Sequence, residues 1–335
     1  MAKILPTKSI YYNDCNLIAQ PAHPSLISRK DIPRELSRVI VSPMDAVVGK
    51  TFAVEATRLG LSVCLHRFCD VNQQLEILRS IRDSNLNLSN VYVSIGLQDW
   101  DRVSLLRDYV SNWVIDCANG YLSTISDSVD TLVRTSEVSS IVVGNIHTKA
   151  GVQLYRRFGK HEKNNNDFNL LIRTGIAGGS ACSTSDATGI NRGQITEIME
   201  CSSETDLHPN FYTIADGGVK NGNYAAKAFG AGADYVMMGG FFARAKEAET
   251  HLIGDGTYWG GASTKQQERY GGTRRHSEGK VYRIEEEPVS LHELVENLWG
   301  GLSSSVSYSG YKSLTDFISN ATFEIKENSL PPGGR

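Results

Sequence analysis

One cysteine, Cys182, lies in a glycine- and hydroxyl-rich stretch that could support nucleophilic chemistry. The stretch, 174–188, reads Thr-Gly-Ile-Ala-Gly-Gly-Ser-Ala-Cys-Ser-Thr-Ser-Asp-Ala-Thr and follows an apolar run. Its glycines leave backbone N–H groups open, and these groups together with the Ser180 hydroxyl could hold a phosphate. A lone cysteine is more often a small buried apolar residue than a nucleophile. The polar, glycine-rich neighbours of Cys182 favour the nucleophile.

Two other loops carry the pattern of a phosphate site. Asp216-Gly-Gly and Gly239-Gly240 each follow a predicted strand. In barrels, the loops after the seventh and eighth strands commonly hold a phosphate on backbone N–H groups. Asp216 is placed to accept hydrogen bonds from a ribose diol, as acidic residues do in nucleotide sites. A phosphorylated ribose is therefore the first ligand that we expect.

With a nucleotide anchored there, the thiolate of Cys182 would face the base. A thiolate can add to an electron-poor ring carbon and form a covalent intermediate. Thr184 and Glu278 could then move protons, because a glutamate can act as general acid for a leaving amine through a threonine hydroxyl. The spacing of Glu278 taken alone still favours a solvated surface carboxylate.

The elements that must position these residues alternate short apolar runs with longer segments of helical spacing, which is typical of βα units. Helical spacing is found, for instance, at 51–58, 71–82, 100–109, 122–135 and 221–229. Because eight strands are expected and several are apolar throughout, we predict an α/β fold, a TIM (β/α)8 barrel, with an open doubly wound sheet as the alternative. The predicted strands are 39–43, 62–65, 91–96, 113–118, 141–145, 170–176, 212–217 and 235–240.

The pattern changes after the eighth strand. Residues 241–285 do not lead straight into a helix and are punctuated by glycine, as in Trp259-Gly-Gly-Ala-Ser. A long glycine-punctuated loop at the catalytic rim of a barrel is a candidate lid, and a disordered insertion is the alternative. The polar run 160–169 is expected to be a solvated surface loop.

Composition excludes several classes of protein. The chain has 335 residues, with 34 Lys and Arg against 37 Asp and Glu, and its net charge of -3 gives no indication of nucleic acid or an acidic membrane as partner. The six cysteines show no paired metal-ligand spacing, which favours a reduced compartment. Since no apolar signal core or membrane-length run is present, we expect a cytoplasmic protein.

The sequence resembles the family of inosine monophosphate (IMP) dehydrogenases and guanosine monophosphate (GMP) reductases. The resemblance runs from Tyr12-Asn-Asp-Cys-Asn-Leu-Ile to a closing Gly-Gly-Leu-Ser-Ser-Ser-Val-Ser-Tyr308. Its most specific motifs are Gly-Gly-Ser-Ala-Cys182-Ser-Thr, Ile-Ala-Asp216-Gly-Gly-Val and Gly-Ala-Gly-Ala-Asp-Tyr-Val-Met-Met-Gly-Gly240.

Three features resemble the reductase branch of this family. They are Asp116-Cys-Ala-Asn-Gly-Tyr121, Ser277-Glu-Gly-Lys280, and a chain without the regulatory CBS pair that most of the dehydrogenases insert. The resemblance thus implies a single barrel domain over 1–335 and NADPH-dependent reductive deamination of a guanine nucleotide. In that reaction Cys182 adds to purine C2, ammonia leaves with help from Thr184 and Glu278, and IMP is released. The family is commonly tetrameric, so a homotetramer is expected.

The resemblance also implies binding residues, carried over position by position. The substrate contacts would be Ser180, Asp216, Gly217, Gly218, Gly239, Gly240, Gly261, Ala262, Arg275, Ser277 and Gly279. The cofactor contacts would be Ser28, Arg29, Arg67, Asp116, Cys117, Ala118, Ser304 and Ser307, some of them across a subunit interface. A potassium ion would be held by Ala177, Gly179, Cys182 and Ser185.

The chain departs from the family pattern at several of these positions. Ala177 replaces a glycine and Ser185 an arginine in the potassium loop, and Arg67 replaces a lysine near the cofactor. The base-facing Met-Ser of the reductases is here Gly261-Ala262, which could widen the purine pocket. A reductase that acts on dGMP or on a modified purine nucleotide therefore remains an alternative.

Two further alternatives stay open. Arg269-Tyr270 resembles the pair with which the dehydrogenases activate water, so conversion of IMP to XMP with NAD is the second candidate reaction. A non-catalytic nucleotide-binding barrel is the third reading. The joint presence of Cys182, Thr184 and Glu278 argues against it, because a binding module needs no proton relay.

Overall fold

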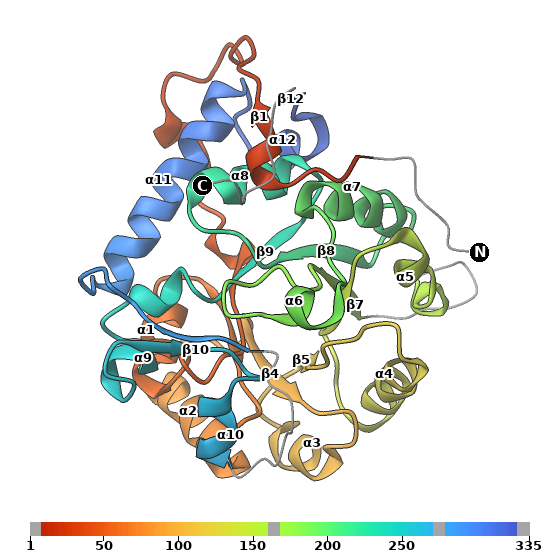
Figure 1. Cartoon of the computed structure of the whole chain (residues 1–335), viewed down its shortest axis with the longest axis vertical. Coiled ribbons are helices and arrows are strands. Elements are labelled where there is room, and N and C mark those ends of the chain that lie inside the picture. Colours follow the sequence, from red (N-terminus) through yellow and green to blue (C-terminus); the bar gives the residue numbers. More distant parts are fainter. Residues whose placement is uncertain (1–7, 160–167, 271–278, 327–335) are drawn as a thin grey trace.

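Eight parallel strands form a closed barrel at the centre of the molecule (Figure 1). The computed structural model describes residues 8–159, 168–270 and 279–326. The last barrel strand pairs with the first, Val39 opposite Val236 and Val41 opposite Met238, which closes the ring. The predicted TIM barrel is therefore confirmed and the open sheet is excluded. The strands are β2 (Val39–Val41), β3 (Ser62–Leu65), β4 (Val91–Ile95), β5 (Asn112–Ile115), β6 (Ser140–Ile146), β7 (Asn169–Thr174), β8 (Phe211–Asp216) and β9 (Tyr235–Met238).

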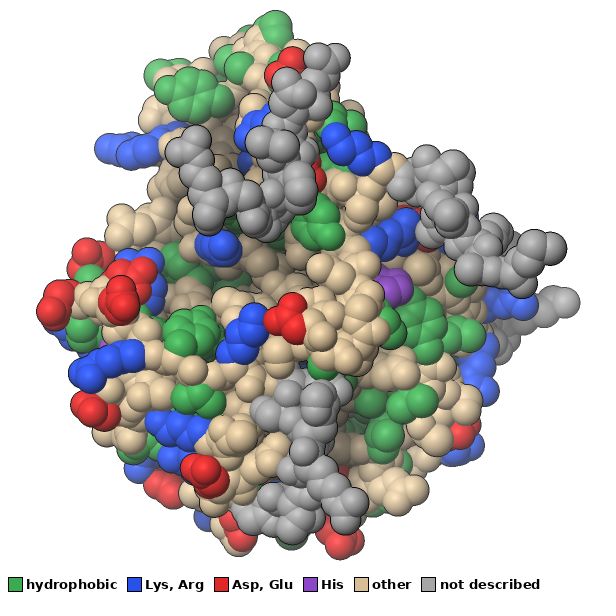
Figure 2. All heavy atoms as spheres, viewed as in Figure 1, with side chains coloured by type: hydrophobic (Ala, Val, Ile, Leu, Met, Phe, Trp, Pro, Cys, Tyr) green, Lys and Arg blue, Asp and Glu red, His purple; other side chains and the backbone are tan. Residues whose placement is uncertain are grey.

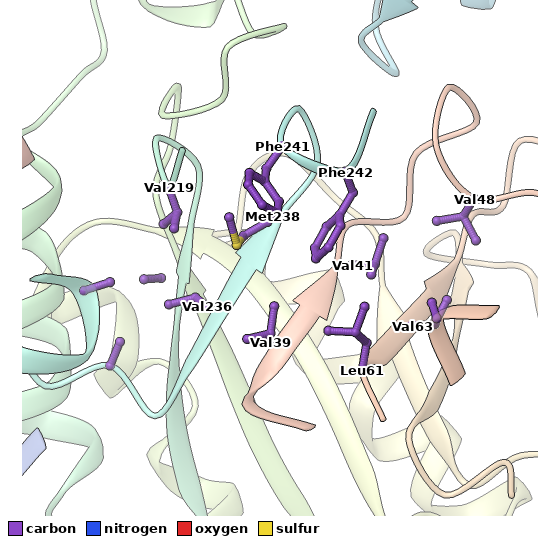
Figure 3. Packing of buried hydrophobic residues seen from close by; sticks show 14 of the residues in the cluster. Val39, Val41, Val48, Leu61, Val63, Val219, Val236, Met238, Phe241 and Phe242 are labelled. Atoms are coloured by element: carbon purple, nitrogen blue, oxygen red, sulfur yellow. The ribbon is translucent and has the colours of Figure 1, made fainter. Parts of the chain in front are cut away.

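The strands are apolar because both of their faces are buried. One residue from each strand packs in the barrel interior, namely Ile40, Cys64, Tyr92, Val114, Val142, Leu171, Ile214 and Met237. The alternate residues point outward, and Figure 3 shows Val39, Val41, Val63 and Val236 among them in the second core, between strands and helices. Successive side chains of a strand face opposite sides, so the next interior layer is set two residues further along each strand.

The helices surround the barrel in the expected alternation (Figure 1). They are α1 (Lys50–Arg58), α2 (Val71–Asp83), α3 (Trp100–Leu106), α4 (Ser123–Thr135), α5 (Lys149–Gln153), α6 (Thr184–Thr188), α7 (Gln194–Thr205), α8 (Gly222–Gly230), α11 (Leu291–Tyr308) and α12 (Leu314–Asn320). In the described part of the chain no helix combines the length and the apolarity needed to cross a membrane. Figure 2 shows basic and acidic side chains interspersed over one face, in keeping with the small net charge.

Helix α11 carries buried apolar residues at helical spacing along its whole length, among them Leu294, Leu298, Leu302 and Val306. It continues through Gly300, Gly301 and the serine run that follows. A Cβ on Gly222, the first residue of α8, would lie 2.9 Å from the backbone of Gly301, so the two helices touch backbone to backbone there. The glycines thus serve close packing and do not end the helix.

The segment 241–285 adds small elements at the carboxyl ends of the barrel strands. It contains the 3-10 turn η5 (Phe242–Arg244), α9 (Glu249–Leu252), α10 (Thr264–Tyr270) and the antiparallel pair of β10 (Thr257–Trp259) with β11 (Val281–Arg283). A second antiparallel pair, β1 (Cys15–Leu17) with β12 (Phe323–Ile325), joins the two ends of the chain. The sequence analysis predicted neither pair.

Asp234, just before β9, makes the stability of the barrel depend on pH. Burial raises the pKa of this carboxyl from 3.8 to about 6, although it accepts a hydrogen bond from Thr213 N–H at 2.8 Å. Because the pKa of Asp234 is higher in the folded than in the unfolded state, its protonated form favours folding. This contribution to stability is complete below about pH 4 and is lost as the pH rises through 6. We expect the free energy of unfolding of the wild type, relative to that of Asp234→Asn, to fall by about 2–3 kcal/mol between pH 4 and pH 7.

Urea unfolding at a series of pH values measures this difference. Asp83→Asn, at the exposed end of α2, is the matched control and should show no such trend. If the difference in free energy of unfolding between the wild type and Asp234→Asn stays constant over this pH range, the raised pKa of Asp234 is contradicted.

Candidate active site

One large cavity opens at the carboxyl ends of the barrel strands. It has a volume of about 1610 Å³ and is lined by loops that follow several different strands. It contains residues from the cysteine loop, the Asp216 loop, the Gly239-Gly240 turn and the segment 241–285. The predicted site residues that line it are Arg67, Asp116, Cys117, Ala118, Ala177, Gly179, Ser180, Cys182, Thr184, Asp216, Gly217, Gly218, Gly239, Gly240, Gly261, Ala262 and Gly279.

The floor of the cavity is a charged layer directly above the apolar barrel interior. Asp116, Arg173 and Asp216 each lie two residues after an interior residue of β5, β7 or β8, so they point the same way. Arg173 Nη2 lies 2.8 Å from Asp216 Oδ2, and Arg173 Nη1 lies 3.5 Å from Asp116 Oδ1. One guanidinium therefore bridges the two acidic residues that the sequence assigns to different ligands.

Neighbouring side chains extend this layer. Asn145 donates to Asp216 Oδ2 at 2.8 Å, and Arg67 Nε lies 3.2 Å from Asp116 Oδ2. Burial works against the charge of Arg173, but Asp216 and then Asp116 outweigh it and raise the pKa of the guanidinium above its usual value. Sequence analysis missed Arg173, although a charged residue in an otherwise apolar strand is a signal that could have found it.

Cys182 lies on the cavity wall with its thiol next to a hydroxyl. Its Sγ donates to Thr184 Oγ1 at 3.1 Å, and Thr184 begins helix α6. Cys182 also forms an antiparallel bridge with Gly279, and Lys280 N–H donates to the carbonyl of Ala181 at 2.8 Å. The cysteine loop and the end of the segment 241–285 are thus joined by backbone hydrogen bonds.

Close backbone contact holds the cysteine loop against the loop after β8. Gly175 has a φ of 125°, and a Cβ on it would lie 1.8 Å from the carbonyl oxygen of Asp216. Gly217 has a φ of 91°, and its Cβ would lie 2.6 Å from the backbone of Gly178. Only glycine fits at these two positions.

The Gly239-Gly240 turn and Ser180, which the sequence predicts to form a phosphate cradle, lie side by side. A Cβ on Gly240 would lie 2.8 Å from Ser180 Oγ, so the turn and the hydroxyl face each other closely. Two tyrosines that the sequence analysis did not single out border this cradle. The Tyr282 hydroxyl donates to Ser180 Oγ at 3.0 Å, and burial raises the pKa of Tyr258, whose ring meets that of Tyr282 edge to face.

Four residues assigned to the cofactor lie elsewhere. Ser28, Arg29, Ser304 and Ser307 do not line the cavity. Arg29 Nη1 donates to Ser304 Oγ at 2.9 Å, which places the turn that starts at Ser28 against helix α11. Three further predicted residues, Arg275, Ser277 and Glu278, fall outside the residues that the structure describes.

The Arg269-Tyr270 pair contacts Asp45 at the rim and does not line the cavity. Arg269 Nε lies 2.9 Å from Asp45 Oδ2, and the Tyr270 hydroxyl donates to Oδ1 at 3.0 Å. Burial raises the pKa of Tyr270 to about 12. The buried carboxylate of Asp45 therefore holds helix α10 against the barrel.

The space beside Gly261 is filled by an aromatic ring. A Cβ on Gly261 would lie 3.1 Å from Phe68, whose ring also lies under the Arg67 guanidinium with 5.0 Å between Cζ and the ring centre. The missing side chain at 261 therefore does not leave an empty pocket at this point.

The closed barrel and the cavity at the carboxyl ends of its strands are typical of barrel enzymes. Residues 28–330 match the family model described as IMP dehydrogenase / GMP reductase domain. The chain belongs to this IMP dehydrogenase and GMP reductase family. The resemblance seen in the sequence is thereby confirmed, as is the assignment as an oxidoreductase similar to GMP reductase.

Three curated relatives show how similar in sequence the chain is to other members of the family. The chain is 28% identical to the GMP reductase of Onchocerca volvulus over 298 residues, which cover 85% of this chain and 79% of that protein. It is 29% identical to the GMP reductase of Vibrio cholerae over 308 residues, covering 87% and 85%. With the GMP reductase of Caenorhabditis elegans the identity is 26% over 336 residues, covering 92% and 90%.

Ala177 in the cysteine loop adopts a backbone conformation that favours glycine. Its φ is 65°, in the left-handed region, which costs a residue with a Cβ about 1–2 kcal/mol. Glycine would remove this cost but lose about 0.4–1 kcal/mol through the unfolded chain. We therefore expect Ala177→Gly to raise the free energy of unfolding by about 0.5–1 kcal/mol in denaturant titrations.

The control for this change is Ala187→Gly in helix α6 of the same loop region. There the substitution should lower stability by about 0.5–1 kcal/mol, because the helical backbone gains nothing from glycine. Equal destabilisation by the two substitutions would contradict the strain at Ala177.

Proposed function

We propose that the protein is an NADPH-dependent reductase that converts GMP, or a closely related guanine nucleotide, to IMP and ammonia through a covalent bond to Cys182. The observation that carries this proposal is the placement of the Cys182 thiol, 3.1 Å from Thr184 Oγ1, in the same cavity as the Ser180 and Gly240 cradle. Membership in the family and the relatives named GMP reductase support it.

The substrate would lie across the cavity from cradle to thiol. Ser180 and the loops of Gly217-Gly218 and Gly239-Gly240 would hold the phosphate, and Asp216 the ribose hydroxyls. The base would then meet Cys182, whose sulfur adds to C2. The C2 amino group leaves as ammonia after protonation, for which the Thr184 hydroxyl is placed to relay the proton. The role proposed for Glu278 lies outside the described residues.

The reduced dinucleotide would supply the hydride that releases the product. The overall reaction, GMP + NADPH + 2 H⁺ giving IMP + NH₄⁺ + NADP⁺, balances in atoms and charge. Arg67, Asp116, Cys117 and Ala118 line the cavity on the Asp116 side of the Arg173 bridge, and they would bind this dinucleotide. The Phe68 ring beside Arg67 offers a flat apolar surface there.

Residues from a second subunit would complete the cofactor site. Ser28, Arg29, Ser304 and Ser307 lie outside the cavity of their own chain, with Arg29 bonded to Ser304. In the homotetramer that we expect, this face would meet the cavity of a neighbour. The segment 241–285 would act as the lid, because it lines the cavity and is joined to the cysteine loop at Gly279.

Two of the four residues expected to hold potassium, Gly179 and Ser185, already use their carbonyl groups within the loop. The carbonyl of Gly179 accepts the Cys182 N–H at 3.0 Å, and the carbonyl of Ser185 accepts the Gly189 N–H at 2.9 Å. Ser185 does not line the cavity. We therefore derive no step through a potassium ion.

The geometry supports the reductase over the alternatives. Arg269 and Tyr270 contact Asp45 outside the cavity, which does not favour a role in activating water for a dehydrogenase. Phe68 fills the space beside Gly261, so GMP itself is the first substrate to test. A non-catalytic barrel that only binds a nucleotide would not need the contact between the Cys182 thiol and the Thr184 hydroxyl.

Purified protein should oxidise NADPH only when GMP is present, with ammonia and IMP formed in equal amounts. Absorbance at the reduced-nicotinamide wavelength measures the rate, dGMP is the second substrate, and IMP with NAD tests the dehydrogenase reaction. Net NADH formation from IMP, or no turnover of any guanine nucleotide, would contradict the proposal.

Cys182→Ala should abolish turnover and leave nucleotide binding in place. We expect kcat to fall by at least about 1000-fold, because the bond to C2 can no longer form. The Kd for GMP should change by less than about threefold, since the phosphate and ribose contacts remain. Ala187→Gly, in the same region but away from the thiol, should keep both values. Retained turnover in Cys182→Ala would show that the sulfur is not the nucleophile.

A further inference from the structure

Arg244 carries a buried donor without a partner at the edge of the cavity. Its Nε is buried and makes no hydrogen bond. Neither terminal nitrogen of the guanidinium forms an ion pair or a hydrogen bond with any residue that the structure describes. Because protein atoms cover Nε, the donors that a ligand in the cavity could reach are the two terminal nitrogens. A charged donor group that lacks a protein partner at a cavity is suited to bind an anion.

The position of Arg244 points to the phosphate end of the cavity. Arg244 lines the cavity and ends the 3-10 turn η5, which is separated from Gly239-Gly240 by Phe241 alone. The N–H groups of Phe242 and Ala243 both donate to the carbonyl of Gly239, at 2.9 and 3.1 Å. The turn that carries the arginine and the turn of the phosphate cradle are therefore one continuous piece of backbone.

The backbone around Arg244 is held firmly. Phe242 is fully buried and meets Phe52 of α1 edge to face, and Figure 3 shows Phe241 and Phe242 packed at the ends of β9 and β2. On the other side, Ala245 pairs with Val289, and Val289 N–H donates to the carbonyl of Arg244. The side chain is thus presented from a fixed backbone, which is what a binding residue needs.

No acidic residue neutralises this arginine within the described residues. Glu285 and Glu286 line the same cavity, but neither forms an ion pair with the Arg244 guanidinium. The cradle itself consists of backbone N–H groups and the hydroxyls of Ser180 and Tyr282, which carry no net charge. Lys220 and Arg283 also line the cavity, but Arg244 is the basic residue on the backbone turn that follows Gly239-Gly240, where it would add a positive charge beside a bound phosphate dianion.

We propose that Arg244 binds the phosphate of the nucleotide substrate and selects a phosphorylated ligand over the free nucleoside. The inference rests on the proposed guanine nucleotide substrate. A guanidinium presents its N–H groups in a planar fork that matches two phosphate oxygens, and such charge-assisted bonds are among the stronger hydrogen bonds. Nothing in the sequence motifs pointed to this residue.

Equilibrium binding of GMP and of guanosine to the full chain, measured by calorimetry without NADPH, tests the proposal. Arg244→Ala should raise the Kd for GMP by about 10- to 100-fold, the loss expected for a hydrogen bond to a charged group, and leave the Kd for guanosine unchanged. Arg244→Lys keeps the charge without the planar fork, so its Kd for GMP should lie between the values for the wild type and for Arg244→Ala. Ribose 5-phosphate against ribose provides the same comparison without a base.

Lys246→Ala is the matched control, because it removes one exposed positive charge two residues away and does not line the cavity. It should leave all four binding constants unchanged. Equal losses of GMP and guanosine binding in Arg244→Ala, an unchanged Kd for GMP, or a wild type with no preference for the phosphorylated probes would overturn the proposal.

The proposed reaction and the role of Arg244 can fail separately. A protein that binds GMP through Arg244 but reduces no guanine nucleotide would refute the reaction alone. A protein that reduces GMP, with the KM for GMP unchanged in Arg244→Ala, would refute the role of Arg244 alone.

Discussion

The site depends on one buried arginine that forms ion pairs with two aspartates at the floor of the cavity. Arg173 extends from β7 between Asp216 on β8 and Asp116 after β5, and its side chain is only 12% exposed. A buried pair that loses one partner is destabilised by about 3–5 kcal/mol, far more than an exposed pair, because the remaining charges stay out of water. The two carboxylates are therefore held at fixed positions, Asp216 where we propose that the nucleotide binds and Asp116 where we propose that the dinucleotide binds.

This arrangement follows from the alternation of side chains along parallel strands. Eight interior residues fill the barrel with an apolar layer, and the next inward-facing residues are polar because the layer above is open to the cavity. The cysteine loop then adds a thiol at the wall, held by backbone contacts at Gly175 and Gly217 that no larger residue would permit. The barrel thus supplies the charged floor, and the loops supply the thiol of Cys182 and the glycine turns beside it.

Much of the fold was predictable because its signals are local. The eight barrel strands appear where the apolar runs predict them, and most of the predicted binding residues line one cavity. What sequence reasoning missed depends on distant contacts. The contact of Arg269 with Asp45 and the bridge from Cys182 to Gly279 have no local signal. Arg173 is different, because strand periodicity places it beside Asp116 and Asp216 once the barrel is assumed.

The central claim is that a guanine nucleotide bound at Cys182 is reduced at C2. Isotope transfer tests it most directly, with NADPH that carries deuterium at C4 on one face or on the other, incubated with GMP and the wild-type protein. The account predicts that IMP formed from one of the two labelled donors contains deuterium at C2, and that IMP formed from the other does not. Unlabelled IMP from both donors, or no IMP at all, would contradict it.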